Sequence, residues 1–118
     1  MTADEHIALV KAYIALSNAH RVDLIERLFA RSAVYRSSAV GEYLGREAIA
    51  GMMDAFFTDY PDVRWRCGNY LHEGSTVSFD FKLEATAASN GENIRRRGHE
   101  RIEFDDDGFI RLLQVDAD

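Results

Sequence analysis

The stretch RGHERIEFDDDG, residues 97–108, reads as a β-strand with a carboxylate on its apolar face. Side chains alternate between the two faces of a strand, so Glu100 shares a face with Ile102 and Phe104. A carboxyl on an apolar face loses hydration, which disfavours its charged form and raises its pKa. Glu100 therefore either points into a pocket as a neutral hydrogen-bond donor, or is ionised and meets water or an arginine such as Arg96.

Two further side chains, in the region from residue 63 onward that is predicted to form strands, are candidates for a functional role. Trp65 either lines a cavity or packs in the core, and its indole N–H needs a partner if it is buried. Cys67 is the single cysteine, so an intrachain disulfide and a CxxC metal site are excluded. A buried, unreactive thiol is the simpler interpretation of Cys67, since no histidine shares its strand face nearby.

The four histidines show no metal-ligand spacing such as HxH or HxxxH. The pattern places them at helix ends, in a turn and on a polar strand face, and we expect them to be solvated: His6, His20, His72 and His99. The chain also has no GxGxxG or P-loop motif. We therefore expect no metal and no cofactor.

The elements that must position these groups run helix, helix, short strand, helix and then four long strands. Thr2 and Glu5 have the spacing of a capping box and predict a first helix that ends near Asn18. The later strands are apolar on one face only, and the helices must cover that face. This order predicts an α+β fold. The other expected elements are a helix at 22–30, a strand at 32–38, a loop at 41–45, a helix at 46–59 and strands from residue 63 onward.

Length and charge set the bounds on function. The 118 residues predict a single domain over 1–118, long enough to bury a core. A net charge of −6 argues against a nucleic-acid binder, because phosphate contacts need a basic face. No apolar run approaches the roughly 20 residues that span a bilayer, and the N-terminus shows no signal-peptide pattern. We expect a cytoplasmic protein without a membrane partner.

The element order and several phrases together resemble the nuclear-transport-factor-2-like superfamily. The phrases are YIALSNAHRVDLIERLFARSAVY (13–35), LGREAIAGMMDAFF (44–57), YPDVRW (60–65) and RGHERIEFDDDGFIRLL (97–113). Within the superfamily the chain is most similar to the SnoaL-like polyketide cyclases and to bacterial ketosteroid isomerases. The resemblance implies a cone in which a curved, mostly antiparallel sheet and three N-terminal helices enclose an apolar pocket. It also implies a homodimer formed through the outer sheet face.

The resemblance also assigns expected roles to residues. Glu100 falls where ketosteroid isomerases carry the acid of their oxyanion hole, and Tyr13 where they carry the second donor to the same oxygen. The position of their proton-shuttling aspartate falls at Ser37, and serine cannot remove a carbon-bound proton unaided. Arg96 could serve as the arginine of the superfamily's epoxide hydrolases only if it points inward. The expected apolar walls are Trp65, Phe57, Phe79, Phe81 and Leu113.

Two hypotheses for function follow. The first is a SnoaL-like protein that binds an apolar carbonyl or enol compound. As an enzyme it would be a cofactor-independent isomerase, cyclase or dehydratase acting through an enolate-like state, with Tyr13 and Glu100 as oxygen donors. The second is a non-catalytic ligand-binding or dimerisation domain, which the serine at position 37 favours. A further alternative is that side chains fill the cavity and the chain is only an interaction module, which its seven Phe and five Tyr favour. Which ligand is bound stays open at this point.

Overall fold

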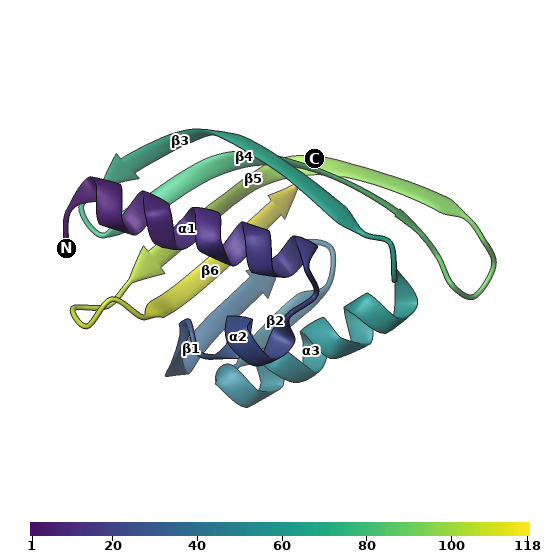
Figure 1. Cartoon of the computed structure of the whole chain (residues 1–118), viewed down its shortest axis with the longest axis horizontal. Helices are drawn as coiled ribbons and strands as arrows, with labels where there is room; N and C mark the ends of the chain where they lie inside the picture. The colour runs from purple at the N-terminus through teal and green to yellow at the C-terminus, as the bar shows by residue number, and fades with distance from the viewer.

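The computed structural model describes residues 1–118 as three helices packed on one six-stranded sheet (Figure 1). Helix α1 (Ala3–Asn18) begins at the predicted capping box, in which Thr2 and Glu5 exchange hydrogen bonds of 3.2 Å. None of the three helices is long and apolar enough to span a membrane. The other elements are α2 (Val22–Glu26), β1 (Phe29–Ser37), β2 (Gly41–Leu44), α3 (Arg46–Asp59), β3 (Arg64–Glu73), β4 (Thr76–Thr86), β5 (Asn93–Phe104) and β6 (Ile110–Ala117).

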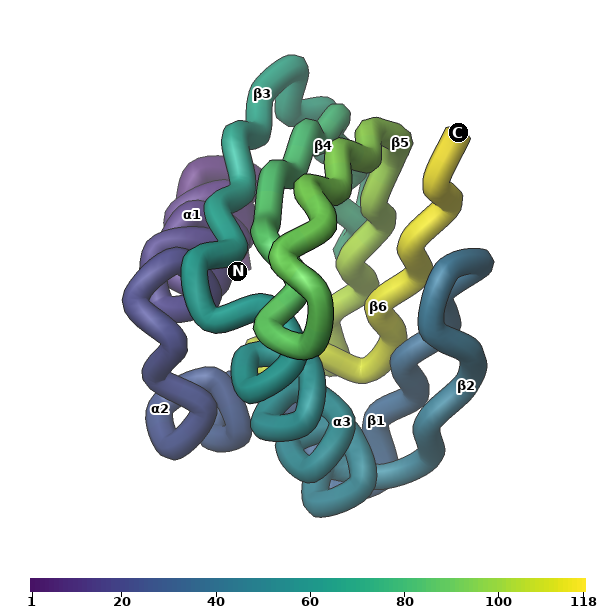
Figure 2. Tube along the Cα trace, turned by 90° about the vertical axis from the view of Figure 1, so that its right-hand side faces the viewer, coloured from purple at the N-terminus to yellow at the C-terminus, as the bar shows by residue number.

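The sheet has the strand order β2-β1-β6-β5-β4-β3, and all neighbours are antiparallel except β1 and β6, which are parallel. Helix α1 crosses one face of the curved sheet, and α3 lies below its open end (Figures 1 and 2). The strands alternate as predicted, and β4 buries every second residue from Val77 to Ala85. The core therefore lies between the inner sheet face and the helices, which is the predicted α+β arrangement.

Two predicted boundaries are wrong. The second helix ends at Glu26 rather than near residue 30, because Phe29 already pairs with Ile110 of β6 and is fully buried there. The expected loop at 41–45 contains strand β2, which forms a hairpin with β1. None of the four residues of β2 is buried, so the alternation of burial that marks the other strands is missing.

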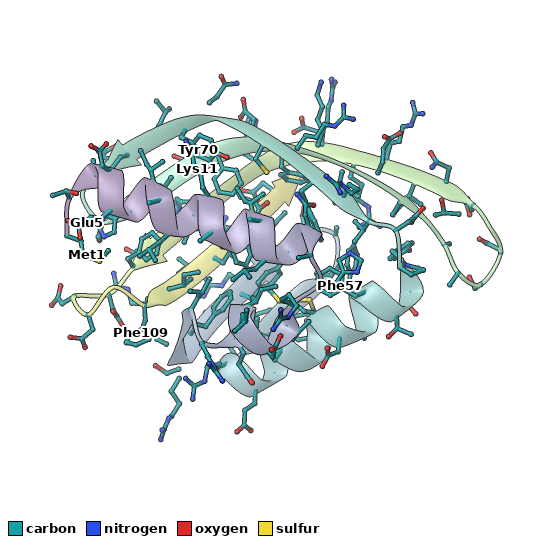
Figure 3. The ribbon with its side chains drawn as sticks, viewed as in Figure 1. Met1, Glu5, Lys11, Phe57, Tyr70 and Phe109 are labelled. Carbon is teal, nitrogen blue, oxygen red and sulfur yellow. The ribbon has the colours of Figure 1, made fainter.

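The histidine prediction also needs correction at the start of α1. His6 is only 5% exposed, and its ring stacks on Phe104 with the centroids 4.7 Å apart. Its Nδ1 lies 2.8 Å from Nε2 of His72 in β3, a hydrogen bond between the two imidazoles. One turn further along α1, Lys11 places its Nζ 5.3 Å from the ring centroid of Tyr70 (Figure 3). These contacts attach α1 to the edge strand β3.

Candidate functional site

A cavity lies on the inner sheet face, between the sheet, α1 and α3. Fifteen of its nineteen lining residues are hydrophobic, and its volume is about 60 Å³. A space of this size holds one or two water molecules, so even a single-ring ligand needs the lining to move. Helix α3 contributes Met52, Met53, Phe56 and Phe57, and methionine side chains adapt readily to such movement.

Strand register builds the floor of the cavity from three successive cross-strand rows on the inner face. Because the rows alternate with outward-facing residues, each lies two positions along β5 from the next. The first row is Trp65, Leu83 and Arg96, the second Cys67, Phe81, Gly98 and Ala117, and the third Glu100, Val115 and Ser37. The side chains that carry chemistry therefore come from β1, β3 and β5, at positions that the sheet holds in register.

Glu100 is the acidic side chain of this cavity. It is 6% exposed and takes part in none of the chain's ion pairs or side-chain hydrogen bonds. Burial alone raises its pKa from 4.5 to about 8, because the charged form loses its hydration. At neutral pH the carboxyl is mainly protonated and can donate a hydrogen bond into the cavity. The structure thus places Glu100 in a pocket, and the ion pair with Arg96 is not formed.

Two tyrosines share the cavity with Glu100. Tyr13 comes from α1 and is 6% exposed, while Tyr35 comes from β1 and is half-buried. Burial raises the pKa of both hydroxyls well above 10, and the negative form of Glu100 raises them further. Both hydroxyls therefore stay protonated and remain donors. Sequence reasoning missed Tyr35, although the alternation of Ala33, Tyr35 and Ser37 on β1 could have indicated that it faces inward.

The predicted wall residues divide into two groups. Trp65, Phe57, Phe81 and Ser37 line the cavity. Phe79 and Leu113 do not: both are buried in the core outside it, which corrects the expectation for these two. Phe79 packs instead against the ring of Tyr70, with the centroids 5.6 Å apart, in the part of the sheet that α1 already covers.

The position of Trp65 is fixed from both sides. The side chain of Asn18, the last residue of α1, accepts a 2.7 Å hydrogen bond from the Trp65 backbone N–H and donates a 3.0 Å bond to its carbonyl. Phe57 of α3, labelled in Figure 3, meets the indole edge-on with the ring centroids 6.0 Å apart. His20 stacks on the same Phe57 ring, with the centroids 4.3 Å apart. The end of α1 and the end of α3 therefore meet at Trp65.

The remaining polar groups of the cavity differ in availability. The Ser37 hydroxyl accepts from the backbone N–H groups of Ala39 and Val40, at 3.1 and 3.3 Å, and so stabilises the β1–β2 turn. The pKa of Cys67 is raised to about 12 by burial and by Glu100, so its thiol is a poor nucleophile. Arg96 is half-buried and lines the cavity, as expected for a residue an even number of positions from Glu100 on the same strand. The lining contains no second carboxyl and no imidazole.

Comparison with known proteins identifies relatives of this arrangement. The family described as the SnoaL-like domain matches residues 10–112. A search among curated proteins finds no match. Several hundred solved structures resemble the chain, and those described below share 14–20% of its sequence, so they establish the fold alone.

Three of these structures illustrate the likeness. SalBIII, an epoxide hydrolase/cyclase-like enzyme in pyran ring formation in the polyether salinomycin, aligns with a TM-score of 0.87 at 18% identity, over 98% of this chain and 92% of its own. An NTF2-like protein of unknown function from Exiguobacterium sp. 255-15 aligns at 0.83 and 20% identity, over 93% and 98%. TerC, co-crystallised with polyporic acid, aligns at 0.79 and 14% identity, over 93% and 88%.

Proposed function

The chain belongs to the SnoaL-like domain family, and from that premise we propose that it binds an apolar small molecule by a carbonyl, enol or phenol oxygen held by Glu100 and Tyr13. The observation that carries the proposal is a nearly buried carboxyl that lines a mostly apolar cavity and has no hydrogen-bond or ion-pair partner in the chain. A buried polar group without a partner is costly, so such a group usually has a functional reason. A ligand oxygen would supply the missing hydrogen bond.

The arrangement supports a catalytic form of this function. A neutral carboxyl and a tyrosine hydroxyl in an apolar cavity stabilise a negatively charged oxygen more strongly than water does, because the low dielectric strengthens their hydrogen bonds. The oxygen of an enolate is such a group. We propose a cofactor-independent isomerisation, cyclisation or dehydration through an enolate-like state, with Tyr13 and Glu100 as donors and Tyr35 as an additional one. The fold shared with SalBIII, an epoxide hydrolase/cyclase-like enzyme, supports small-molecule chemistry.

A second candidate function is binding without turnover. The cavity lining holds no second carboxyl and no imidazole to take a carbon-bound proton, and the Ser37 hydroxyl is engaged in the adjacent turn. A compound whose carbon-bound proton is already acidic, such as a 1,3-dicarbonyl compound, needs the weakest base to remove that proton. Deuterium exchange at the central carbon of a 1,3-diketone, followed by NMR, separates the two functions: binding with accelerated exchange indicates the enzyme, and binding alone indicates the non-catalytic domain.

Binding itself is tested with 4-methylphenol, because a phenol oxygen imitates an enol and a single ring requires the least movement of the cavity lining. Trp65 is the sole tryptophan, so its fluorescence reports the titration. We expect Glu100→Gln and Tyr13→Phe each to weaken binding about threefold to tenfold, the worth of one hydrogen bond. The affinity of wild type should change as the pH rises through 8, because an ionised Glu100 accepts from the phenol O–H instead of donating to its oxygen, whereas Glu100→Gln should bind independently of pH.

Two matched controls accompany these variants. Glu103→Gln removes a carboxyl from the outer face of the same strand, where it pairs with Arg111, and Tyr60→Phe removes a hydroxyl outside the cavity. Both should bind as wild type does. If Glu100→Gln and Tyr13→Phe also bind unchanged, the ligand oxygen is not held by these two groups and the proposal is wrong.

A further inference from the structure

Two polar side chains of opposite character project from β5 into the apolar cavity, and they lie at different depths. Glu100 is buried, whereas Arg96 is half-buried and marks the solvent side. They lie four positions apart on one strand face, which corresponds to about 13 Å between their Cα atoms. Gly98 lies between them and adds no side chain, so the floor between the two polar groups is made by apolar neighbours such as Phe81 and Ala117.

Arg96 differs from the arginines on either side of it in having no carboxylate partner. Arg95 pairs with Glu84 at 2.8 Å and Arg97 lies 4.0 Å from Asp118, both on the outer face. The neighbour of Arg96 across the ladder is Leu83, and the chain supplies Arg96 with neither an ion pair nor a side-chain hydrogen bond. A guanidinium drawn partly out of water favours an anion that can accept two parallel N–H bonds, and a carboxylate has that geometry.

The two groups do not neutralise one another. A nearby guanidinium would lower the pKa of Glu100, but that pKa is raised and burial is its sole cause. Arg96 is therefore left with its charge uncompensated at one end of the cavity, and Glu100 with an unused donor at the other. A single molecule that spans the floor could satisfy both.

We propose that the cavity selects amphiphilic monoanions, in which a carbonyl, enol or phenol oxygen reaches Glu100 while a carboxylate at the other end of an apolar body reaches Arg96. This inference rests on the proposed function and adds to it the charge and polarity of the ligand. The ring that carries the oxygen enters the inner volume when the methionine side chains of α3 move aside. The flexible chain that follows extends along the floor toward the half-buried Arg96, where the guanidinium and solvent share its carboxylate.

Two isosteric probes test the proposal by isothermal titration calorimetry near pH 7: 3-(4-hydroxyphenyl)propanoate and its neutral amide, 3-(4-hydroxyphenyl)propanamide. Both offer the same phenol to Glu100, and only the first offers an anion to Arg96. We expect wild type to bind the acid about tenfold more tightly than the amide, the usual gain from a hydrogen bond to a charged group. Arg96→Gln should abolish this preference by weakening binding of the acid far more than binding of the amide, and Arg96→Lys should restore part of it.

Arg97→Gln is the matched control, because it removes the same charge one residue away on the opposite face. It should retain the preference for the acid. Equal binding of acid and amide by wild type, or an equal loss of both in Arg96→Gln, would overturn the inference while leaving the proposed function intact, provided that the amide still requires Glu100. If neither probe binds, the proposed function fails and this inference fails with it.

Discussion

The Glu100 carboxyl leaves water when the chain folds, and its pKa rises from 4.5 to about 8. Between these two values the folded protein binds a proton that the unfolded chain has released, so stability falls as the pH rises through this window. The shift corresponds to an upper limit of about 5 kcal/mol, at about 1.4 kcal/mol for each pH unit. Keeping Glu100 buried is therefore costly at neutral and alkaline pH.

Glu100→Gln should remove this cost, since an amide does not titrate. We expect the variant to match wild type near pH 4.5 and to exceed it in free energy of unfolding by several kcal/mol, up to the limit of about 5 kcal/mol, near pH 8.5. Urea unfolding at several pH values measures the difference. Glu103→Gln, on the exposed face, is the control and should follow wild type at every pH. A constant difference between Glu100→Gln and wild type across the range would show that Glu100 is ionised in the folded state.

At the scale of elements, a pair of imidazoles attaches the start of α1 to β3. His6 and His72 share a 2.8 Å hydrogen bond, which requires at least one neutral ring. Burial, the positive form of His72 and the N-terminal amine lower the pKa of His6, against a smaller opposite effect of Glu5. A histidine whose pKa is lowered on folding stabilises the fold at high pH, and this stability is lost as the pH falls below 6.5.

We therefore expect acid to loosen the α1–β3 contact. Because Glu100 changes stability in the opposite direction below pH 8, the measurement belongs in a Glu100→Gln background. There, the free energy of unfolding should drop by about 1 kcal/mol between pH 7 and pH 5, and His6→Phe should reduce the drop while keeping the stack on Phe104. An unchanged drop in the His6→Phe chain would assign the acid sensitivity to other groups.

Gly98 fixes the distance between β5 and β6 beside the cavity floor. A Cβ at this position would lie 2.1 Å from the Asp116 carbonyl oxygen and 2.8 Å from the Ala117 Cα, so the backbone of β6 would have to move. Gly98→Ala should lower the free energy of unfolding by about 2–3 kcal/mol, as overpacking does. Gly51→Ala is the matched control: it lies in α3 with nothing within 4 Å and should raise stability by about 0.5–1 kcal/mol. Chemical denaturation compares the two variants. If Gly98→Ala leaves the free energy of unfolding unchanged, the backbone of β6 moves aside without cost.

The elements also show what a sequence can and cannot predict. The alternation in β4 and β5 indicated the inner face correctly and led to Glu100, because burial on one side imposes a period of two. The same rule failed for β2, which buries none of its residues, and for Phe29, whose burial in a strand follows from pairing with Ile110 far along the chain. The position of α1 on the sheet decides which inward-facing residues line the cavity, and the sequence did not indicate that position. Phe79 was therefore predicted to line the cavity, although it lies in the part of the sheet that α1 covers.

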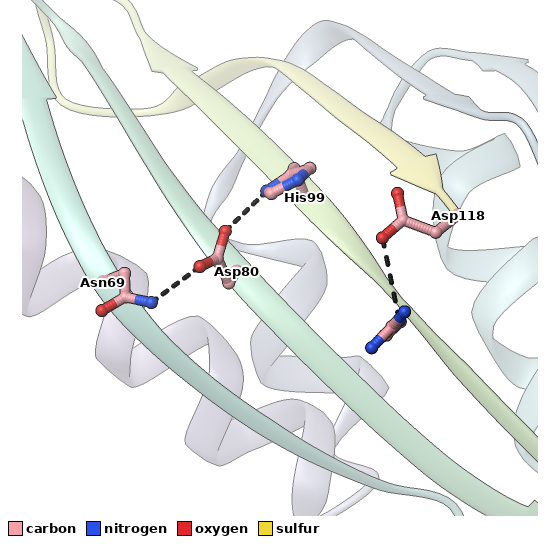
Figure 4. Close-up of polar contacts among 5 residues, drawn as sticks. Asn69, Asp80, His99 and Asp118 are labelled. Atoms are coloured by element: carbon pink, nitrogen blue, oxygen red, sulfur yellow. Dashed lines mark hydrogen bonds and ion pairs between the residues drawn. The ribbon is translucent and has the colours of Figure 1, made fainter.

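At the scale of the whole molecule, the outer face of the sheet carries polar side chains that no helix covers. At its centre Asp80 accepts a 2.7 Å hydrogen bond from Asn69 and pairs with His99 on the next strand (Figure 4). Beyond them, Arg66, Lys82 and Arg97 are direct cross-strand neighbours, so three cations stand in one row. Like charges placed opposite one another destabilise a sheet unless something compensates them.

We predict that two copies pair through this face, as the sequence resemblance implies. A stable pair would bury roughly 1,200–2,000 Å² in all and would have twice the 13.4 kDa mass of one chain in light scattering. His99→Asp places a second carboxylate beside Asp80 and should weaken the pair at least tenfold, because two desolvated like charges would have to meet. Ala55→Asp adds the same charge on the exposed side of α3 and should leave the pair intact. A monomer at every concentration would show that this face stays in water, and the cationic row would then persist without a protein partner.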